Sequence, residues 1–230
     1  MMEVERTRGQ CRICGKSFAK AGMTRHVRAC RGKLAGAGVA DRLLVALGAR
    51  YLPSYWLVVE VAPTATGGDL DGFIRRIWVE CCGHLSCFEL GGTTFADDVD
   101  GAAEWADDPR SMEEPIFDTV AAGSRFRYEY DFGTTTELAG TVLAAVPGGP
   151  AGRPIEVLAR NDPPQHRCVE CGRDATTLCG LCYQAVDDPC WYCDTCSAQH
   201  RCGDPGGDYF LPVVNSPRVG LCGYGGPADG

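Results

Sequence analysis

Long apolar segments are absent from this sequence. Its 230 residues contain no run of about 18 apolar residues, which is close to the shortest stretch that spans a bilayer as a helix. The basic N-terminus is not followed by the apolar region of a secretory signal peptide. We therefore expect a cytosolic (cytoplasmic) protein that makes no contact with membranes.

A disulfide framework is excluded by the same expectation, because the cytosol keeps thiols reduced. The chain has 15 cysteines, and an odd number cannot be fully paired within one chain. Metal binding therefore explains the cysteines better than disulfide bonding does.

Familiar catalytic motifs are also missing. The sequence has no phosphate-binding loop, no dinucleotide-binding glycine pattern, no nucleophile elbow and no catalytic zinc signature. Their absence favours a binding protein that is not an enzyme. Two alternatives stay open: a cysteine-dependent enzyme or redox protein with its site near Cys82 and His84, and a protein whose zinc ions serve only its architecture.

Lysine is scarce and unevenly placed. All three lysines lie in residues 1–36, together with six arginines and only two acidic residues. This arm has a net charge of +7, and the overall charge of −8 leaves −15 for the rest of the chain. A basic arm on an acidic body predicts an anionic partner for the arm.

Changes in composition along the chain predict five parts. They are a basic finger (1–33), a Gly/Ala-rich linker with a candidate short helix through DRLLVAL (34–50), a core domain (51–160), a cysteine-rich module (166–204) and a Gly/Pro-rich tail (205–230).

The core domain mixes strand and helix patterns. Branched and aromatic residues in YWLVVEV (55–61) favour a strand. Apolar residues from Leu70 to Cys81 recur at helical spacing after Asp69, which can cap a helix. The segment RFRYEYDFG (125–133) alternates, with its four aromatic residues on one face, and predicts a half-buried antiparallel strand. We expect an α+β fold, an antiparallel sheet with packed helices, in which HLSCFEL, TELAGTVLAAV and IEVLAR supply further strands.

The first metal site is predicted in CRICGKSFAKAGMTRHVRAC. Two residues separate Cys11 from Cys14, and three separate His26 from Cys30. A tight turn directs both cysteine sulfurs to one ion, and residues four apart on a helix share one face. The four side chains can complete a zinc tetrahedron, with Phe18 and Met23 as the small core of the finger.

The finger is similar to the two-Cys two-His zinc finger, but its fourth ligand is cysteine and the spacing between its ligand pairs is one residue shorter. Single modules of this kind bind DNA weakly. We expect Arg25, Arg28 and Arg31 to contact phosphates of a nucleic acid or another polyanion without reading its sequence.

A second metal-binding region lies in the cysteine-rich module. Three cysteine pairs with two-residue spacing are followed by one mixed pair: Cys168/Cys171, Cys179/Cys182, Cys193/Cys196 and His200/Cys202. Eight ligands suit two structural zinc ions. We expect interleaved pairing, with Cys168, Cys171, Cys193 and Cys196 on one ion and Cys179, Cys182, His200 and Cys202 on the other. This order resembles cross-braced modules such as B-boxes and MYND fingers, which mostly bind proteins, and sequential pairing stays open. With the finger, the sequence predicts about three zinc ions per chain; Cys190 and His166 are left over.

A further cluster of cysteines stands in ECCGHLSCFE, where Cys81, Cys82, His84 and Cys87 lie close together, and Cys222 follows far downstream. Cysteine is among the most buried residue types, so core packing is the favoured interpretation. A metal or redox site and a cysteine nucleophile are the alternatives.

Two segments of the core resemble the plasmid pRiA4b open-reading-frame-three-like family of bacterial and archaeal proteins, which is often described alongside transposon passenger proteins. They are FIRRIWVECCGHLSCFEL and FRYEYDFGTTTEL. The resemblance covers about residues 53–160, and YEYDFG (128–133) is its most specific element. The family commonly continues with an aspartate, a tryptophan and a histidine, where this chain has three threonines, so no role of that tryptophan or histidine carries over.

The segments VLARNDPPQHRCVECG and LPVVNSPRVGLCGYGG also look like a zinc-finger-bearing subgroup of that family. The resemblance implies an α+β fold with helices on an antiparallel sheet, and it implies no defined activity. From the residues we expect a zinc-binding adaptor whose finger contacts a nucleic acid and whose C-terminal module binds a protein.

Overall fold

The structure, a computed structural model of the chain, describes residues 7–34, 40–117, 120–148, 153–186, 190–202 and 209–227. Short stretches of every predicted part lie outside these ranges. They include 1–6 of the finger, 35–39 of the linker and 205–208 of the tail.

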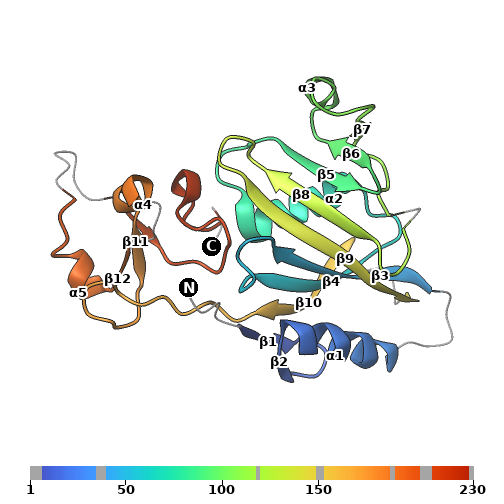
Figure 1. Ribbon diagram of the computed structural model, residues 1–230. Helices are drawn as coiled ribbons and strands as arrows, with labels where there is room; N and C mark the ends of the chain where they lie inside the picture. Colours follow the sequence, from blue (N-terminus) through green and yellow to red (C-terminus); the bar gives the residue numbers. More distant parts are fainter. Residues whose placement is uncertain are drawn as a thin grey trace.

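Ten strands form one large sheet in the order β2-β1-β10-β4-β3-β9-β8-β5-β6-β7 (Figure 1). All neighbouring pairs are antiparallel except β6 and β7, which are parallel. The strands are β1 (Arg8–Cys11), β2 (Ser17–Ala19), β3 (Ala40–Ala49), β4 (Trp56–Val61), β5 (Ser86–Leu90), β6 (Thr93–Ala96), β7 (Arg110–Ser111), β8 (Arg125–Tyr130), β9 (Thr136–Pro147) and β10 (Ile155–Asn161). The expected α+β class, with an antiparallel sheet, therefore holds.

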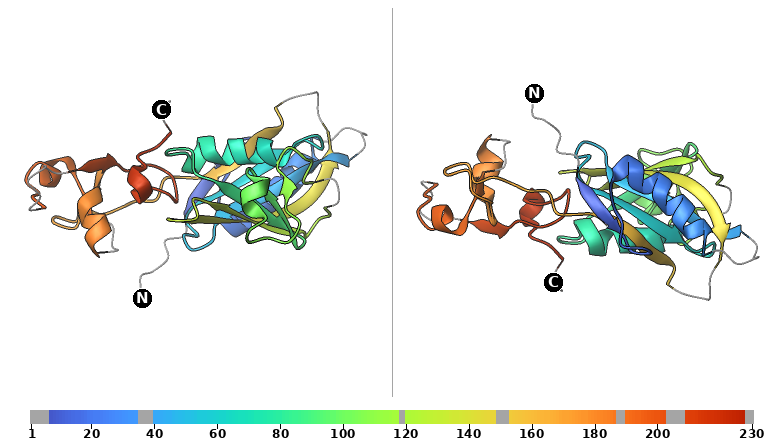
Figure 2. Two further views of the ribbon diagram at one scale, coloured as in Figure 1. Left: turned by 90° about the horizontal axis from the view of Figure 1, so that it is seen from above. Right: turned by 90° about the horizontal axis from the view of Figure 1, so that it is seen from below.

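Helices cover both faces of the sheet, as the two views of Figure 2 show. Helix α1 (Lys20–Gly32) lies over one face, and α2 (Gly67–Ile74) with the π-helical turn η1 (Arg75–Val79) lies over the other. The short α3 (Val99–Ala102) follows β6.

Strand β4 is buried on both faces. Its odd-numbered residues belong to the larger apolar core, together with Leu70 of α2 and Trp78 of η1. Trp56 and Val58 point to the opposite face and pack in a smaller core with Met23 of α1. All six residues of the strand are buried, which explains why YWLVVEV shows no alternation of apolar and polar residues.

Helix α2 begins earlier than the sequence predicts. Its N-cap is Thr66, whose side chain accepts a hydrogen bond from Asp69 N at 3.1 Å, and the Asp69 carboxylate accepts one from Thr66 N at 3.0 Å. This capping box places Asp69 at the third helical position and not at the cap itself. The predicted apolar stripe does face the sheet.

The linker with a short helix through DRLLVAL is a wrong prediction, because this segment forms strand β3. It pairs with β4 on one side and β9 on the other. Leu44 packs on one face of the sheet, and Val45 and Leu47 pack on the other. Burial on two faces produces an unbroken apolar run, which periodicity alone cannot distinguish from a helix.

The basic finger is part of the sheet and not a separate domain. Strand β1 pairs with β10, and β2 pairs with β1. Met23 and Val27 of α1 are fully buried against β4 and β10 residues. The boundary expected near residue 33 therefore divides one continuous hydrophobic core.

Strand β8 ends before the predicted position. Phe126, Tyr128 and Tyr130 are buried as expected, but Phe132 is 44% exposed. Asp131 takes a left-handed backbone conformation with φ of 64°, and this conformation turns the chain out of the sheet.

The cysteine-rich module has its own three-stranded sheet, ordered β12-β11-β13. Its elements are β11 (Thr177–Cys179), α4 (Gly180–Val186), β12 (Trp191–Tyr192), α5 (Asp194–Ser197) and β13 (Phe210–Pro212). Strand β13 lies in the predicted Gly/Pro-rich tail, and residues 209–227 of this tail are structured. They continue through the 3₁₀ turn η2 (Leu221–Gly223) between the module and the core (Figure 1).

No helix in the described part of the chain has the length and apolar character needed to cross a membrane.

A buried ion pair joins the finger to the sheet. Arg31 Nε donates to Glu60 Oε2 at 2.5 Å, and Arg31 Nη2 donates to the carbonyl oxygen of Pro147 at 3.0 Å. Arg42 Nε lies 3.6 Å from Glu60 Oε1. Arg31 and Glu60 are each less than a tenth exposed. This ion pair therefore sits in the smaller core.

Replacing Arg31 with alanine should lower the free energy of unfolding by about 3 kcal/mol, because the Glu60 carboxylate would stay buried without its main partner. Arg28→Ala is the matched control, since Arg28 is exposed on the same helix. Urea unfolding followed by circular dichroism measures both. Equal effects of the two substitutions would contradict the role of the buried pair.

Candidate metal centres

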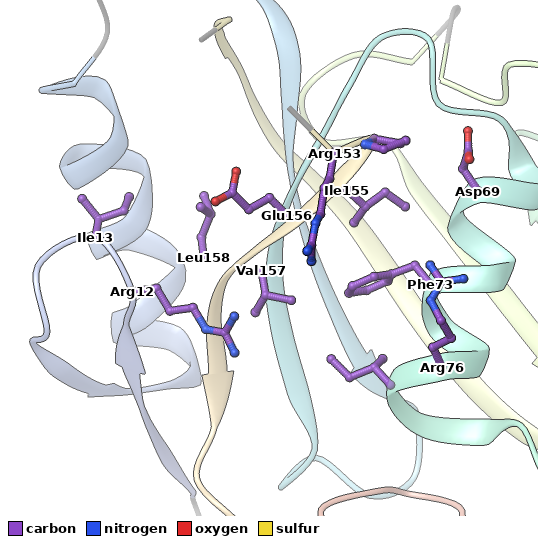
Figure 3. Close-up of a pocket in the computed structure, with 12 residues that line it drawn as sticks. Arg12, Ile13, Asp69, Phe73, Arg76, Arg153, Ile155, Glu156, Val157 and Leu158 are labelled. Carbon is purple, nitrogen blue, oxygen red and sulfur yellow. The ribbon is translucent and has the colours of Figure 1, made fainter. Parts of the chain in front are cut away.

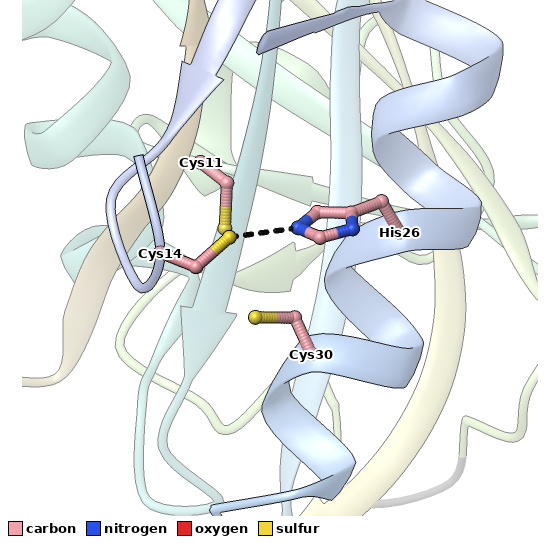
Figure 4. Close-up of side chains that lie close together, drawn as sticks. All are labelled: Cys11, Cys14, His26 and Cys30. Carbon is pink, nitrogen blue, oxygen red and sulfur yellow. Dashed lines mark hydrogen bonds between the residues drawn. The ribbon is translucent and has the colours of Figure 1, made fainter. Parts of the chain in front are cut away.

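The finger brings its four predicted donors together (Figure 4). Cys11 ends β1, Cys14 lies on the turn that follows, and His26 and Cys30 lie one turn apart on α1. Cys14 Sγ is 3.2 Å from His26 Nε2, and all four donor atoms lie within 4.8 Å of one another. Gly15, with φ of 73°, closes the turn by donating from its N–H to the Cys11 carbonyl at 2.7 Å.

Packing holds this cluster against the sheet. Cys11 is fully buried, and the Phe18 ring stacks on His26 with the ring centroids 4.5 Å apart. Phe18 and Met23 therefore serve as the predicted small core of the finger, which is continuous with the core over β4.

The three arginines that were predicted to contact phosphates lie in different environments. Arg25 and Arg28 are exposed on α1. Arg31 is only 8% exposed and is bound to Glu60, so its predicted contact with an anionic partner is wrong. Arg31 lies on the same helix face as Met23 and Val27, which pack on the sheet.

The module gathers its donors in two groups of four. One group is Cys168, Cys171, Cys193 and Cys196; the other is Cys179, Cys182, His200 and Cys202. Each group takes pairs that are not adjacent in the sequence, and this is the interleaved arrangement. Cys190 and His166 lie outside both groups, and the His166 ring stacks on Trp191 with the ring centroids 3.9 Å apart.

The distances between donors suit a tetrahedral ion. Sulfurs bound to zinc at about 2.3 Å are about 3.8 Å apart along a tetrahedral edge. Cys171 Sγ is 3.7 Å from Cys193 Sγ, and Cys182 Sγ is 3.5 Å from Cys202 Sγ. The Cys182 sulfur lies 3.3 Å from His200 Nε2. Cys202 Sγ lies closer to two other donors, 3.0 Å from Cys179 Sγ and 2.8 Å from His200 Nε2. The donor sets are therefore compact enough to surround one ion each, and some of their edges are shorter than those of a zinc tetrahedron.

Electrostatics also favour a metal-binding thiolate in the first group. Arg173 Nε donates to Cys171 Sγ at 3.3 Å, and this hydrogen bond lowers the pKa of the Cys171 thiol to about 6. The thiolate is the form of cysteine that binds metals.

The structure also brings together Cys81, Cys82, His84 and Cys222, with all donor atoms within 4.8 Å. Cys82 and Cys222 are exposed, so core packing does not describe them. Cys87 is different: it is buried beside Ala96 and Ala102, outside the four groups, and burial raises its pKa to about 12. The favoured interpretation from the sequence therefore fits Cys87 and fails for Cys82.

Arg218 and its partners around this cluster were missed by sequence reasoning. Arg218 is fully buried and donates to Asp131 Oδ2 at 2.5 Å. Its guanidinium carbon lies 4.8 Å from the centroid of the Tyr130 ring. No local pattern indicates such a contact, because the two ion-pair partners are 87 positions apart.

Comparisons with known proteins leave the family open. No protein-family model matches the chain, and no curated protein matches it. Among solved structures, the chain is similar to a protein of unknown function, MM3350 from Methanosarcina mazei Go1, at 16% sequence identity and a TM-score of 0.45. The alignment covers 52% of this chain and 68% of that chain. A similarity at this level identifies neither a fold nor a function.

The two possible pairings in the module predict opposite metal losses. With interleaved pairing, the double substitution Cys171→Ser and Cys193→Ser disrupts one site, whereas Cys171→Ser with Cys182→Ser disrupts both. We expect the first variant to retain one more zinc ion per chain than the second, measured by elemental analysis. A higher zinc content in the second variant than in the first would show sequential pairing.

Proposed function

We propose that this protein binds zinc at the finger and at two sites in the module, and that it acts as a binding protein and not as an enzyme. The donor groups carry this proposal: each offers cysteine sulfurs or histidine nitrogens at four positions. Such ligands suit zinc, and a site filled by four protein ligands leaves no position for a reacting water.

Zinc has a clear structural task in the module. The buried members of its apolar cluster are Cys168, Cys179, Tyr192 and Cys193. Three of these four are candidate ligands, and Leu178 and Leu211 are the other large apolar side chains buried in its sheet, so candidate ligands make up much of the module's interior. Metal binding then supplies the folding energy that a hydrophobic core would otherwise provide.

An arginine-lined groove beside the finger supports a contact with an anionic partner (Figure 3). Its volume is about 930 Å³. Arg12 reaches it from the turn between Cys11 and Cys14, Arg76 reaches it from η1, and Arg153 precedes β10. We define this cavity, with these three arginines, as the arginine groove.

Charge in the arginine groove is only partly balanced by the protein itself. Within the described ranges, none of its three arginines forms an ion pair. The groove also contains Asp69 and Glu156, but the Asp69 carboxylate is engaged at the start of α2. The groove is cationic although the chain as a whole has a net charge of −8. Such a groove suits a polyanion better than it suits the acidic body of a second copy of the chain.

We identify the polyanion as a nucleic acid, held through its phosphates. Guanidinium groups bind phosphates in a bidentate way, and phosphate contacts position a nucleic acid without reading its bases. Exposed Arg25 and Arg28 on α1 offer further phosphate contacts outside the groove, and buried Arg31 does not. The acidic body keeps the affinity low and dependent on salt.

Three further parts of the proposal rest on the sequence. The module docks a protein partner, and the exposed Val169 in its first cysteine turn offers an apolar contact. The chain belongs to the zinc-finger-bearing subgroup of the pRiA4b family, and it works in the cytosol. A thiol-dependent enzyme near Cys82 is the second candidate, favoured by the 3.0 Å distance between Cys82 Sγ and His84 Nε2.

The arginine groove predicts a specific loss of binding. Replacing Arg12 and Arg76 with alanine should weaken binding at least tenfold at low salt, about equally for all sequences. The slope of log affinity against log salt should fall by about 2, one for each lost phosphate contact. Fluorescence anisotropy with duplex and single-stranded oligonucleotides measures both effects.

The matched control for this experiment is Arg110→Ala with Arg125→Ala. It removes the same charge from the other half of the sheet, on β7 and β8. An equal loss in the control would show that net charge alone matters. No binding by the intact protein at low salt would show that nucleic acid is the wrong partner.

A further inference from the structure

Two distant segments meet at one donor cluster. The loop between η1 and β5 contributes Cys81, Cys82 and His84, and the C-terminal turn contributes Cys222. His84 Nε2 lies 3.0 Å from Cys82 Sγ and 3.4 Å from Cys222 Sγ. Cys82 Sγ is also 3.6 Å from Cys81 Sγ and 3.7 Å from Cys222 Sγ. These values match the edges of a zinc tetrahedron as closely as those in the module do.

We propose that Cys81, Cys82, His84 and Cys222 form a fourth zinc centre that fastens the C-terminal segment to the core sheet. The sequence predicts about three ions, so this centre adds one to that number. It does not depend on the nucleic-acid proposal, because none of its ligands lines the arginine groove.

The surroundings of the cluster are built for a negatively charged site. Arg218 Nη2 donates to Cys81 Sγ at 3.4 Å, and Arg218 itself is fully buried. A cationic donor to a ligand sulfur stabilises the thiolate and orients it, as the outer partners of zinc ligands do. Arg218 is fixed in turn by Asp131, by the Thr134 carbonyl at 2.9 Å and by Thr136.

The arrangement fits a closed ligand set better than it fits a disulfide or a catalytic thiol. The Cys82 and Cys222 sulfurs are 3.7 Å apart, whereas a disulfide bond is about 2 Å long. A nucleophilic cysteine needs one neighbouring base. Here Cys82 has two further sulfurs and an imidazole around it, which together complete a closed ligand set.

Fastening the C-terminal segment also positions the module. Residues 209–227 carry β13, which pairs with β11 of the module. The same segment contacts the core: Ser216 Oγ donates to the Trp78 carbonyl at 2.5 Å, and Asn161 Nδ2 donates to Asn215 Oδ1 at 2.8 Å. Zinc at this centre thus holds the place where the module meets the sheet.

Metal content of the full-length protein tests the fourth centre. Protein purified without added metal should contain about four zinc ions by elemental analysis. The variants Cys222→Ser and His84→Ala should each contain one ion fewer. His84→Cys should retain the ion, because a thiolate replaces the imidazole. Cys87→Ala is the control that removes a thiol outside the cluster, and it should retain all the zinc.

A second measurement separates loss of this ion from general unfolding. In cobalt-substituted protein, His84→Cys should shift the visible absorption from a three-sulfur, one-nitrogen centre toward a four-sulfur centre. Near-ultraviolet circular dichroism of Cys222→Ser should keep the signal of the core aromatic residues. About three ions in the intact protein, or equal zinc in all variants, would overturn the proposal. Rapid alkylation of Cys82 in the zinc-loaded protein would overturn it as well.

Discussion

Burial of strand β4 on both faces is the constraint on which the rest of the structure depends. A strand whose two faces are apolar needs cover on each side, because exposed apolar surface costs free energy. Helix α2 and η1 cover one face, and α1 of the finger covers the other. The single charged residue of β4, Glu60, is accommodated because Arg31 and Arg42 approach it. The finger is therefore a layer of the core as well as a candidate metal site.

The finger and the module depend on candidate metal ligands, whereas the central strands of the large sheet depend on apolar packing. The central strands bury large aliphatic and aromatic residues, whereas the buried cluster of the module consists mainly of cysteines. In the finger, Cys11 is both a candidate ligand and a member of the smaller core. Removing metal would on this basis affect the module most directly, and in the finger it would act through the packing of α1 on the sheet.

Arginine side chains have three distinct tasks here. Arg31 and Arg218 are buried and bind carboxylates, so they connect segments that are far apart in the chain. Arg173 donates to a cysteine sulfur in the module. Arg12, Arg76 and Arg153 line the groove without forming an ion pair in the described part of the chain. Arg31 is bound to Glu60 and does not face a partner, whereas the groove arginines and the exposed Arg25 and Arg28 keep their charge for one.

The sequence by itself determined the finger donors, the eight module donors, five strands of the large sheet (β4, β5, β8, β9 and β10) and the apolar stripe of α2, because each depends on short-range spacing. Tertiary structure alone decided the rest. Whether DRLLVAL is a helix or a strand depended on its pairing with β4 and β9. Whether Arg31 faces a partner or Glu60 depended on how α1 packs. The meeting of Cys222 with His84 bridges 138 positions, and no local pattern encodes contacts across such a separation.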